Sequence, residues 1–299
     1  MGNTTNQPET IGALIDYGAA ELERAGVFFG HGTDNAIDEA ASLVYSVAGL
    51  DHCAAGTPPY GELVDPAVRD RVLELLETRI ADRRPMPYLL QEAWFAGLRF
   101  YVDERVLIPR SPFAELIGWR FDPWLDPSRV ERILEIGTGS GCIAIACALA
   151  FPAARVVATD LSNDALAVAR INVDGHSLAN RVELLQADLF DGVEGRFDLI
   201  VSNPPYVPEA EVASLPPEYA HEPGMALGSG ADGLESTRHI LQDAPRHLAG
   251  DGLLAIEVGC GWQALEHAFP QLPFVWPEFE AGGEGIALIG AADLNRAKS

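Results

Sequence analysis

Arg132-Ile133-Leu134-Glu135-Ile136-Gly137-Thr138-Gly139-Ser140-Gly141 is the stretch that decides the fold class of this chain. Its first half is mostly apolar and predicts a buried β-strand, whereas the glycines that follow predict a tight turn. The apolar run at 142–150 then predicts a helix. A strand, a glycine turn and a helix in this order are typical of nucleotide-binding α/β units. In such units glycine lets the backbone approach a ligand, and the helix N-terminus presents free amides.

Two common nucleotide-site patterns are missing from this turn. Its glycines do not have the G-x-G-x-x-G spacing that is typical of nicotinamide-binding units. No lysine follows them, as one would in a phosphate-binding P-loop. The turn therefore predicts a ligand site at the end of a strand without identifying the ligand.

The next two predicted strands each end in an aspartate. Residues 155–159 lead into Asp160, and residues 182–187 lead into Asp188 and the apolar Leu189. A carboxylate after the second strand can accept hydrogen bonds from both hydroxyls of a ribose, while Asp188 and its apolar neighbour can flank an adenine. Either aspartate also fits an ordinary helix cap.

The fourth predicted strand, 197–201, leads into the elbow Asn203-Pro204-Pro205-Tyr206. The two prolines fix φ and remove two backbone donors, so the elbow is stiff. The Asn203 side-chain oxygen and a freed backbone carbonyl can then both accept hydrogen bonds from one NH₂ group, and Tyr206 offers a flat face beside it. Taken alone, the elbow also fits an ordinary turn. Together with the three preceding strand ends, it predicts a site for a planar amino or amide nitrogen at the carboxyl edge of a parallel sheet.

Two further charged residues are candidates for this site. Glu135 would place a charge inside the first strand, so it needs a partner: the ammonium group of a ligand, nearby backbone amides or a buried cation of the protein. Arg110 lies in a proline-held loop at 106–112 and is expected either at the site or in solvent. The sequence suggests no histidine or carboxylate beside the elbow, so we expect chemistry without a titrating base.

The chain before the sheet predicts a different organisation. Helical periodicity over 10–25, after a cap at Thr33 or Asp34, and after Asp65 with Pro66 at the first helical position predicts three packed helices. The predicted domains are a helical domain at 1–83, a β-hairpin linker at 84–112, and an α/β domain at 113–299.

Composition is that of an ordinary globular protein with an unusual charge. Of the 299 residues, 48% are hydrophobic and 21% are charged, which is near the average for folded domains. Lys+Arg 20 against Asp+Glu 44 gives a net charge of −24, which disfavours a phosphate backbone and favours a cationic partner. A generally acidic proteome would produce the same bias. We expect no direct DNA binding.

Cysteine usage and the apolar segments bear on the compartment. Cys53, Cys142, Cys147 and Cys260 form no C-x-x-C pair, so neither a metal site nor a disulfide framework is expected. The polar N-terminus lacks the pattern of a secretory signal, and the apolar run at 133–150 is interrupted by a glutamate and glycines. We therefore expect a cytoplasmic protein without a membrane span.

The ordered set formed by the Glu135–Gly141 turn, Asp160, Asp188 and the Asn203–Tyr206 elbow resembles that of class I S-adenosyl-L-methionine-dependent methyltransferases of the protein-glutamine methyltransferase family. The resemblance implies an α/β fold: a Rossmann-like seven-stranded sheet with a small N-terminal helical domain and a β-hairpin linker. It also implies that the helical domain at 1–83 is a substrate-recognition domain and that the domain at 113–299 is the methyltransferase domain. We expect the last two strands to be an antiparallel pair at 274–279 and 286–289. The implied cofactor is S-adenosyl-L-methionine, with no metal.

The resemblance also assigns roles to residues. The implied cofactor-binding residues are Glu135, Gly137, Thr138, Gly139, Gly141, Asp160, Leu161, Asp188, Leu189 and Asn203. The implied catalytic residues are Asn203, Pro204 and Tyr206. The implied substrate-binding residues are Asn203, Pro204, Pro205, Tyr206 and Arg110.

Several stretches bear on the substrate. Residues 29–35, 93–95, 100–105, 109–112 and 215–223 are more similar to the branch of the family that methylates a glutamine of the third large-subunit ribosomal protein than to the branch that acts on peptide release factors. The implied partner is thus a basic ribosomal protein, met before or during assembly. Three alternatives stay open: a release factor, an adenine amino group of a nucleic acid, and a fold that binds the cofactor without catalysis. The stretch 257–262 departs from the family in having no Asn or Gln after its first glycine, which puts the role of that loop in doubt.

Overall fold

The computed structural model describes residues 8–50, 59–280 and 282–296. The expectations about Cys53 and the first seven residues fall outside these ranges and stay predictions. The chain divides into two compact units, Met1–Ala93 with Pro216–His221, and Trp94–Leu215 with Glu222–Ser299. The domain bounds proposed from the sequence, at 83 and 112, remain a proposal beside this division.

Three of the described helices of the first unit begin at side-chain caps that their sequences supply. In its described residues the unit contains α1 (Ile11–Ala25), α2 (Ala36–Ala48), α3 (Pro66–Asp82), α4 (Met86–Leu90) and the 3₁₀ turn η2 (Pro217–His221). Thr10 and Asp65 accept hydrogen bonds from the amides of Ala13 and Ala67. The cap of α2 is Asn35, so the predicted cap at Thr33 or Asp34 is wrong; Asn caps a helix at least as well as either residue.

A buried arginine organises the interior of this unit. Arg79 of α3 is 0% exposed, and its Nε donates to Glu39 Oε1 of α2 at 2.8 Å. Its Nη1 donates to Glu218 Oε1 at 3.2 Å, and its Nη2 donates to the Phe28 carbonyl at 2.8 Å. Removing charges from water is costly unless they are paired and hydrogen-bonded. This network therefore requires Glu218, which lies far along the chain, to pack with the helices.

A two-stranded hairpin follows the helices. It is formed by β1 (Ala93–Phe95) and β2 (Leu98–Phe100). Ala96 and Gly97 both have positive φ, 50° and 73°, which is the backbone of a tight two-residue hairpin turn. The β-hairpin expected within 84–112 is present.

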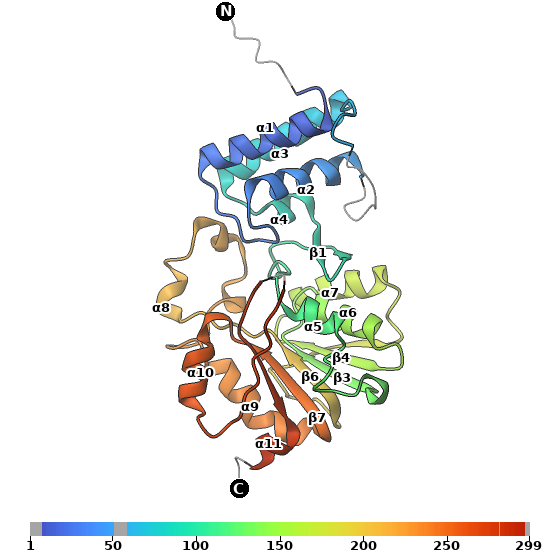
Figure 1. Ribbon diagram of the computed structural model, residues 1–299, viewed down its shortest axis with the longest axis vertical. Helices are drawn as coiled ribbons and strands as arrows, with labels where there is room; N and C mark the ends of the chain where they lie inside the picture. Colours follow the sequence, from blue (N-terminus) through green and yellow to red (C-terminus); the bar gives the residue numbers. More distant parts are fainter. Residues whose placement is uncertain (1–7, 51–58, 281, 297–299) are drawn as a thin grey trace, which may run out of the picture. The chain divides into compact units, whose positions relative to one another are not determined.

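The second unit is built on a mostly parallel sheet (Figure 1). In the described residues its strands are β3 (Arg132–Ile136), β4 (Arg155–Asp160), β5 (Val182–Gln186), β6 (Phe197–Ser202), β7 (Leu248–Glu257) and β8 (Ile286–Gly290). Their order is β5-β4-β3-β6-β7-β8, and only β8 is antiparallel to its neighbour. The chain leaves β3 toward β4 and β5 and later returns to the other side of β3 with β6. A parallel sheet binds ligands at such a switch point, beyond the carboxyl ends of the strands.

Helices lie on both faces of this sheet (Figure 1). The α-helices are α5 (Phe113–Gly118), α6 (Cys142–Ala150), α7 (Asn163–Gly175), α8 (Glu209–Val212), α9 (Glu235–His247), α10 (Trp262–Ala268) and α11 (Ala291–Arg296), and the 3₁₀ turns are η1 (Pro127–Arg129), η3 (Gly224–Ala226) and η4 (Gly259–Gly261). One apolar core joins α5 and α6 to one face of the sheet, and a second joins α9, α10 and α11 to the other. The predicted α/β class is confirmed.

The predicted strand at 274–279 is wrong. In the described residues this segment makes one antiparallel bridge, in which the backbone groups of Val275 and Leu288 exchange hydrogen bonds at 2.9 Å. Pro273 and Pro277 flank the bridge and have no amide to donate, so a longer ladder cannot form on both sides of it. The described sheet accordingly has six strands rather than seven.

Candidate active site

The glycine turn between β3 and α6 forms an open cradle. Gly137 and Gly139 have φ of 73° and 53°, and a Cβ at either position would meet no atom within 4 Å. Side chains there would point into open space, where a ligand can approach the backbone instead. Gly141 has a different reason to be glycine, because its Cβ would lie 3.3 Å from Ala169 Cβ. It is the N-cap residue of α6 and does not line the cavity.

Glu135 is held by the N-terminus of α6. The side chain is 1% exposed, and its Oε2 accepts hydrogen bonds from Thr138 Oγ1 at 2.5 Å and from the Ala144 amide at 2.9 Å. Burial raises the pKa of this carboxyl to about 8, although both hydrogen bonds act to lower it. The backbone-amide partner considered from the sequence is therefore present.

Asp160 is clamped at the end of β4. Its Oδ2 accepts from the Gly139 amide at 2.8 Å, and its Oδ1 accepts from the Ser162 amide at 2.9 Å. Burial raises the pKa of the carboxyl, and the backbone hydrogen bonds oppose that shift. The N-cap of α7 is Ser162, whose hydroxyl accepts from the Ala165 amide. Asp160 is thus not the helix cap, and its orientation is fixed by both loops.

The end of β5 makes a sharp turn. Leu189 has a positive φ of 51°, which is uncommon for a residue with a side chain. Its carbonyl accepts a hydrogen bond from Thr159 Oγ1 at 3.4 Å. Asp188 and Leu189 both line the cavity described below.

The elbow after β6 is tied to the first strand. Ser202 Oγ donates to the Ile136 carbonyl at 2.9 Å, which joins the ends of β6 and β3. Asn203 is half-buried and Pro204 is buried. Tyr206 turns its hydroxyl toward Glu257 and donates to Oε1 at 3.2 Å. It does not line the cavity, so its predicted contact with a substrate stays a prediction.

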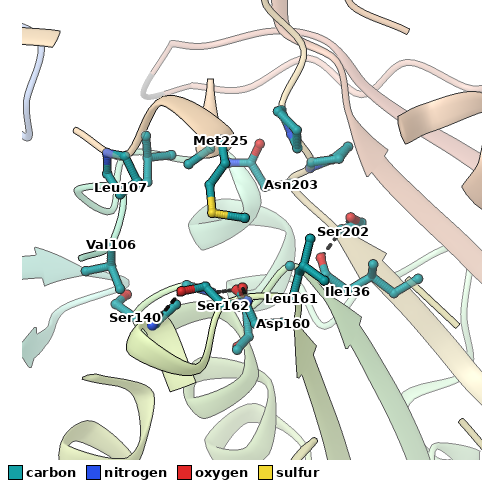
Figure 2. Close-up of a pocket in the computed structure, with 18 of the residues that line it drawn as sticks. Val106, Leu107, Ile136, Ser140, Asp160, Leu161, Ser162, Ser202, Asn203 and Met225 are labelled. Atoms are coloured by element: carbon teal, nitrogen blue, oxygen red, sulfur yellow. Dashed lines mark hydrogen bonds between the residues drawn. The ribbon is translucent and has the colours of Figure 1, made fainter. Parts of the chain in front are cut away.

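These strand ends enclose a cavity of about 370 Å³. Every site residue predicted from the sequence lines it except Gly141 and Tyr206. Figure 2 shows Asp160, Leu161 and Ser162 on one side of the cavity and Asn203 with Met225 on another. The glycine cradle and the Asn-Pro-Pro elbow thus open on the same space.

Arg110 lines the cavity but its charge is already matched. Its Nη1 and Nη2 donate to the two carboxylate oxygens of Glu222, each at 2.6 Å. Glu222 Oε1 also accepts from the Ile108 amide at 3.1 Å. The pair is bidentate, which fixes the plane of the guanidinium. Arg110 is therefore a fixed part of the cavity wall rather than a solvated side chain.

Comparison with known proteins supplies a family. Residues 123–215 match the family model of the Methyltransferase small domain. The chain is 46% identical to the Ribosomal protein uL3 glutamine methyltransferase of Bordetella pertussis, with 99% of each chain covered. It is 47% identical to the protein of the same name from Xanthomonas campestris, covering 95% of this chain and 92% of that one.

The chain belongs to the uL3 glutamine methyltransferase family. A relative from Neisseria meningitidis is 45% identical over 94% of this chain and 92% of its own length. Among solved structures, the catalytic domain of hMettl16 has a TM-score of 0.54 at 17% identity, covering 76% of this chain and 84% of that one, which supports the methyltransferase fold alone. No helix in the described part of this family member has the length and apolarity to cross a bilayer.

Several cavity residues of this uL3 glutamine methyltransferase family member were not found by sequence reasoning. They are Arg105, Val106, Leu107, Ile108, Pro109, Ser111, Ile136, Ser140, Cys142, Ile143, Ser162, Ala165, Ala187, Ser202, Pro223, Met225, Ala226, Gly228 and Ser236. Met225 is 55% exposed, large and apolar, and it lies in the proline- and glycine-rich segment after the elbow. A long loop of that composition was its only signal in the sequence.

Glu257 corrects the expectation that no carboxylate lies beside the elbow. It ends β7, is 3% exposed, and accepts hydrogen bonds from the hydroxyls of Ser111 and Tyr206. Burial raises its pKa to about 7, while those hydroxyls and the charge of Arg110 lower it. A glutamate at the end of an apolar strand is the same pattern that marked Glu135, and it was available in the sequence.

Proposed function

We propose that this chain transfers a methyl group from S-adenosyl-L-methionine to the side-chain amide nitrogen of a glutamine in ribosomal protein uL3, the third protein of the large subunit. The observation that carries the proposal is the shared cavity: Asn203 and Pro204 line the same space as the glycine cradle and Asp160. The names of relatives that are 46% and 47% identical over nearly the whole chain support the same reaction.

The cavity residues fit the cofactor. The Gly137 and Gly139 backbones leave room that a Cβ would fill, as the methionine part of the cofactor requires. Asp160 presents a fixed carboxylate for ribose hydroxyls, and Asp188 with Leu189 provides a polar and an apolar edge for adenine. When bound, S-adenosyl-L-methionine supplies an electrophilic methyl group on a sulfonium ion. Glu135 sets the position of the turn through the Thr138 hydroxyl.

Asn203 and Pro204 would orient the acceptor. A glutamine amide nitrogen is a poor nucleophile because its lone pair is delocalised into the carbonyl, so geometry matters more than base strength. The Asn203 side-chain oxygen and the Pro204 carbonyl accept the two N–H bonds of the amide and direct the nitrogen toward the methyl group. Pro204 has no amide hydrogen and is buried, which keeps the elbow stiff. Tyr206 is proposed to pack on the amide plane.

Proton removal is not required before methyl transfer in this scheme. The proton that the product must lose leaves after the new bond has formed. Glu257 contacts Tyr206 rather than lining the cavity, so it is not assigned as the base.

The proposed partner agrees with the charge of the chain. A net charge of −24 is complementary to a basic ribosomal protein and repels free nucleic acid. We propose that the protein meets uL3 in the cytoplasm, before or during ribosome assembly, and that it binds neither DNA nor a membrane directly.

The test offers labelled S-adenosyl-L-methionine with uL3, a peptide release factor and DNA in separate reactions. Label should enter uL3 and be found on a glutamine by mass spectrometry. Faster labelling of the release factor would replace the proposed substrate by that one. Label in DNA would assign the elbow to an adenine amino group, and label in none would contradict the enzymatic reading.

A further inference from the structure

One buried carboxylate of the second unit has no role in the reaction described above. Glu257 Oε2 accepts from the Ser111 hydroxyl, and its Oε1 accepts from the Tyr206 hydroxyl at 3.2 Å. Ser111 lies 146 residues before Glu257, and Tyr206 lies 51 residues before it. A single side chain therefore joins the end of β7 to two distant segments.

Both segments belong to the wall of the cavity. Ser111 lines it directly and also accepts from the Phe113 amide at 3.1 Å, so its hydroxyl fixes the start of α5. Tyr206 closes the elbow whose earlier residues, Asn203 and Pro204, face the cavity. The carboxylate thus connects the loop that carries Ser111 with the elbow.

The Tyr206 side chain has little freedom in this position. A Cβ on Gly259 would lie 2.8 Å from Tyr206 Cε2, so the ring packs directly on the glycine backbone. A Cβ on Gly233 would lie 2.2 Å from the Tyr206 carbonyl oxygen. Glycine at these two positions lets the elbow approach the loops, and the Glu257 hydrogen bond sets the remaining rotation of the phenol.

We infer that Glu257 is a positioning residue for methyl transfer: through Tyr206 and Ser111 it holds the elbow and the 109–112 loop together, so that Asn203 and Pro204 stay aimed into the cavity. The inference rests on the proposed function. It assigns no contact between Glu257 and substrate, since the residue does not line the cavity.

If Glu257 positions the elbow, ionisation of its carboxyl should make the turnover number depend on pH. An ionised carboxylate accepts hydrogen bonds from the hydroxyls of both Ser111 and Tyr206. A protonated carboxyl carries an O–H that donates, so one of these two hydroxyls would have to accept instead. Burial raises the pKa of Glu257 to about 7. The charged and titratable groups around it are Tyr206 of the elbow, Arg110 of the loop and Glu222, which pairs with Arg110. The turnover number should therefore fall as the pH drops through about 7.

The experiment measures kcat and KM for uL3 methylation between about pH 6 and 8 with labelled cofactor, in the wild type, Glu257→Gln, Tyr206→Phe and the double variant. Each single change should lower kcat on the order of tenfold, the size expected for a hydrogen bond to a charged group. The Kd for S-adenosyl-L-methionine, measured by calorimetry, should stay within about twofold, because the cofactor residues are untouched. The acid limb of the kcat profile should be absent in Glu257→Gln.

The double variant and a matched control separate positioning from general damage. If Glu257 acts through Tyr206, the double variant loses much less than the product of the two single losses. Asp198→Asn is the control, because Asp198 accepts two backbone hydrogen bonds at the other end of β6; it should keep the wild-type profile. Two results would overturn the inference while leaving the proposed function intact. One is a loss of kcat in the double variant that equals the product of the two single losses; the other is a Glu257→Gln variant that keeps the wild-type kcat and its decrease at low pH. If Glu257→Gln fails to bind cofactor, Tyr206→Phe, which removes only a hydroxyl, decides the question. A wild type that does not methylate uL3 would instead contradict the proposed function.

Discussion

The carboxylate of Asp160 and the backbone amide of Gly139 are joined by a hydrogen bond of 2.8 Å, which ties the glycine turn after β3 to the end of β4. The two loops that would hold neighbouring parts of the cofactor, its methionine part and its ribose, are therefore not independent. A change at Asp160 should move the glycine turn as well as remove a carboxylate.

We predict that Asp160→Ala weakens S-adenosyl-L-methionine binding by on the order of tenfold or more, because it removes the ribose acceptor and frees the turn. The Kd is measured by calorimetry. Asp164→Asn is the control, since Asp164 lies in the first turn of α7 and does not line the cavity. An unchanged Kd in Asp160→Ala would contradict the ribose assignment.

Asn203→Ala should separate binding from chemistry. The side chain lines the cavity at the elbow, so its loss removes one acceptor for the substrate amide and leaves the cofactor wall largely intact. We expect kcat for uL3 methylation to fall by about 100-fold or more, with the cofactor Kd nearly unchanged. Asn180→Ala, at an exposed asparagine outside the cavity, should behave as the wild type. Retained turnover in Asn203→Ala would remove Asn203 from the mechanism.

Glu135 should make the stability of the protein depend on pH. Its pKa is about 8 in the folded chain against an ordinary 4.5, so between these values the folded state holds a proton that the unfolded state has lost. The free energy of unfolding should therefore fall as the pH rises through this window, by at most about 1.4 kcal/mol per unit. When the free energy of unfolding is measured by denaturant titration at several pH values, its decrease per pH unit should be smaller in Glu135→Gln than in the wild type. Glu131→Gln, at an exposed position just before β3, should keep the wild-type slope.

Arg79 should be a strong contributor to the stability of the first unit. Arg79→Met leaves the buried carboxylates of Glu39 and Glu218 without this cation, which costs roughly 3–5 kcal/mol in comparable cases. Arg71→Met is the matched control on the same helix: its pair with Glu74 is exposed, so the change should cost about 1 kcal/mol or less. Unfolding midpoints by circular dichroism compare the two. Equal unfolding midpoints in Arg79→Met and Arg71→Met would show that the buried network adds nothing to the stability of the first unit.

Association with uL3 should be sensitive to salt. If the net charge of −24 attracts a basic substrate, the association rate measured by stopped flow falls as ionic strength rises from about 0.05 to 0.5 M. The dissociation rate should change less. An association rate independent of salt would remove the electrostatic argument for the partner.

Local patterns were sufficient for the parallel strands of the sheet and for one wall of the cavity. An apolar run predicts a buried strand, and a polar residue at or near its end (Glu135, Asp160 or Asn203) predicts a polar strand end. Both signals lie within a few residues of each other, so a single sequence is enough to find them. The helix predicted at 142–150 has those bounds because its glycine cap adjoins it.

Features that depend on distant partners were not predicted. Arg79 lies on the face of a helix that also carries apolar residues, and only the carboxylates of Glu39 and Glu218 make its burial possible. Glu257 appeared as the end of a strand, because Ser111 and Tyr206 lie far away in the sequence. The single bridge at Val275 reflects Pro273 and Pro277, which interrupt the ladder in an otherwise apolar segment that has the pattern of a strand.

The short segment Pro216–His221 has a consequence for protein engineering. It packs within the first unit although the chain on both sides of it belongs to the second. Grafting the helical unit of one family member onto the catalytic unit of another would therefore need two separate inserts. A chimaera that exchanged only residues 1–93 would pair Arg79 with a foreign counterpart of Glu218. Compatibility at that position, rather than at the single junction near residue 93, would decide whether such a hybrid folds.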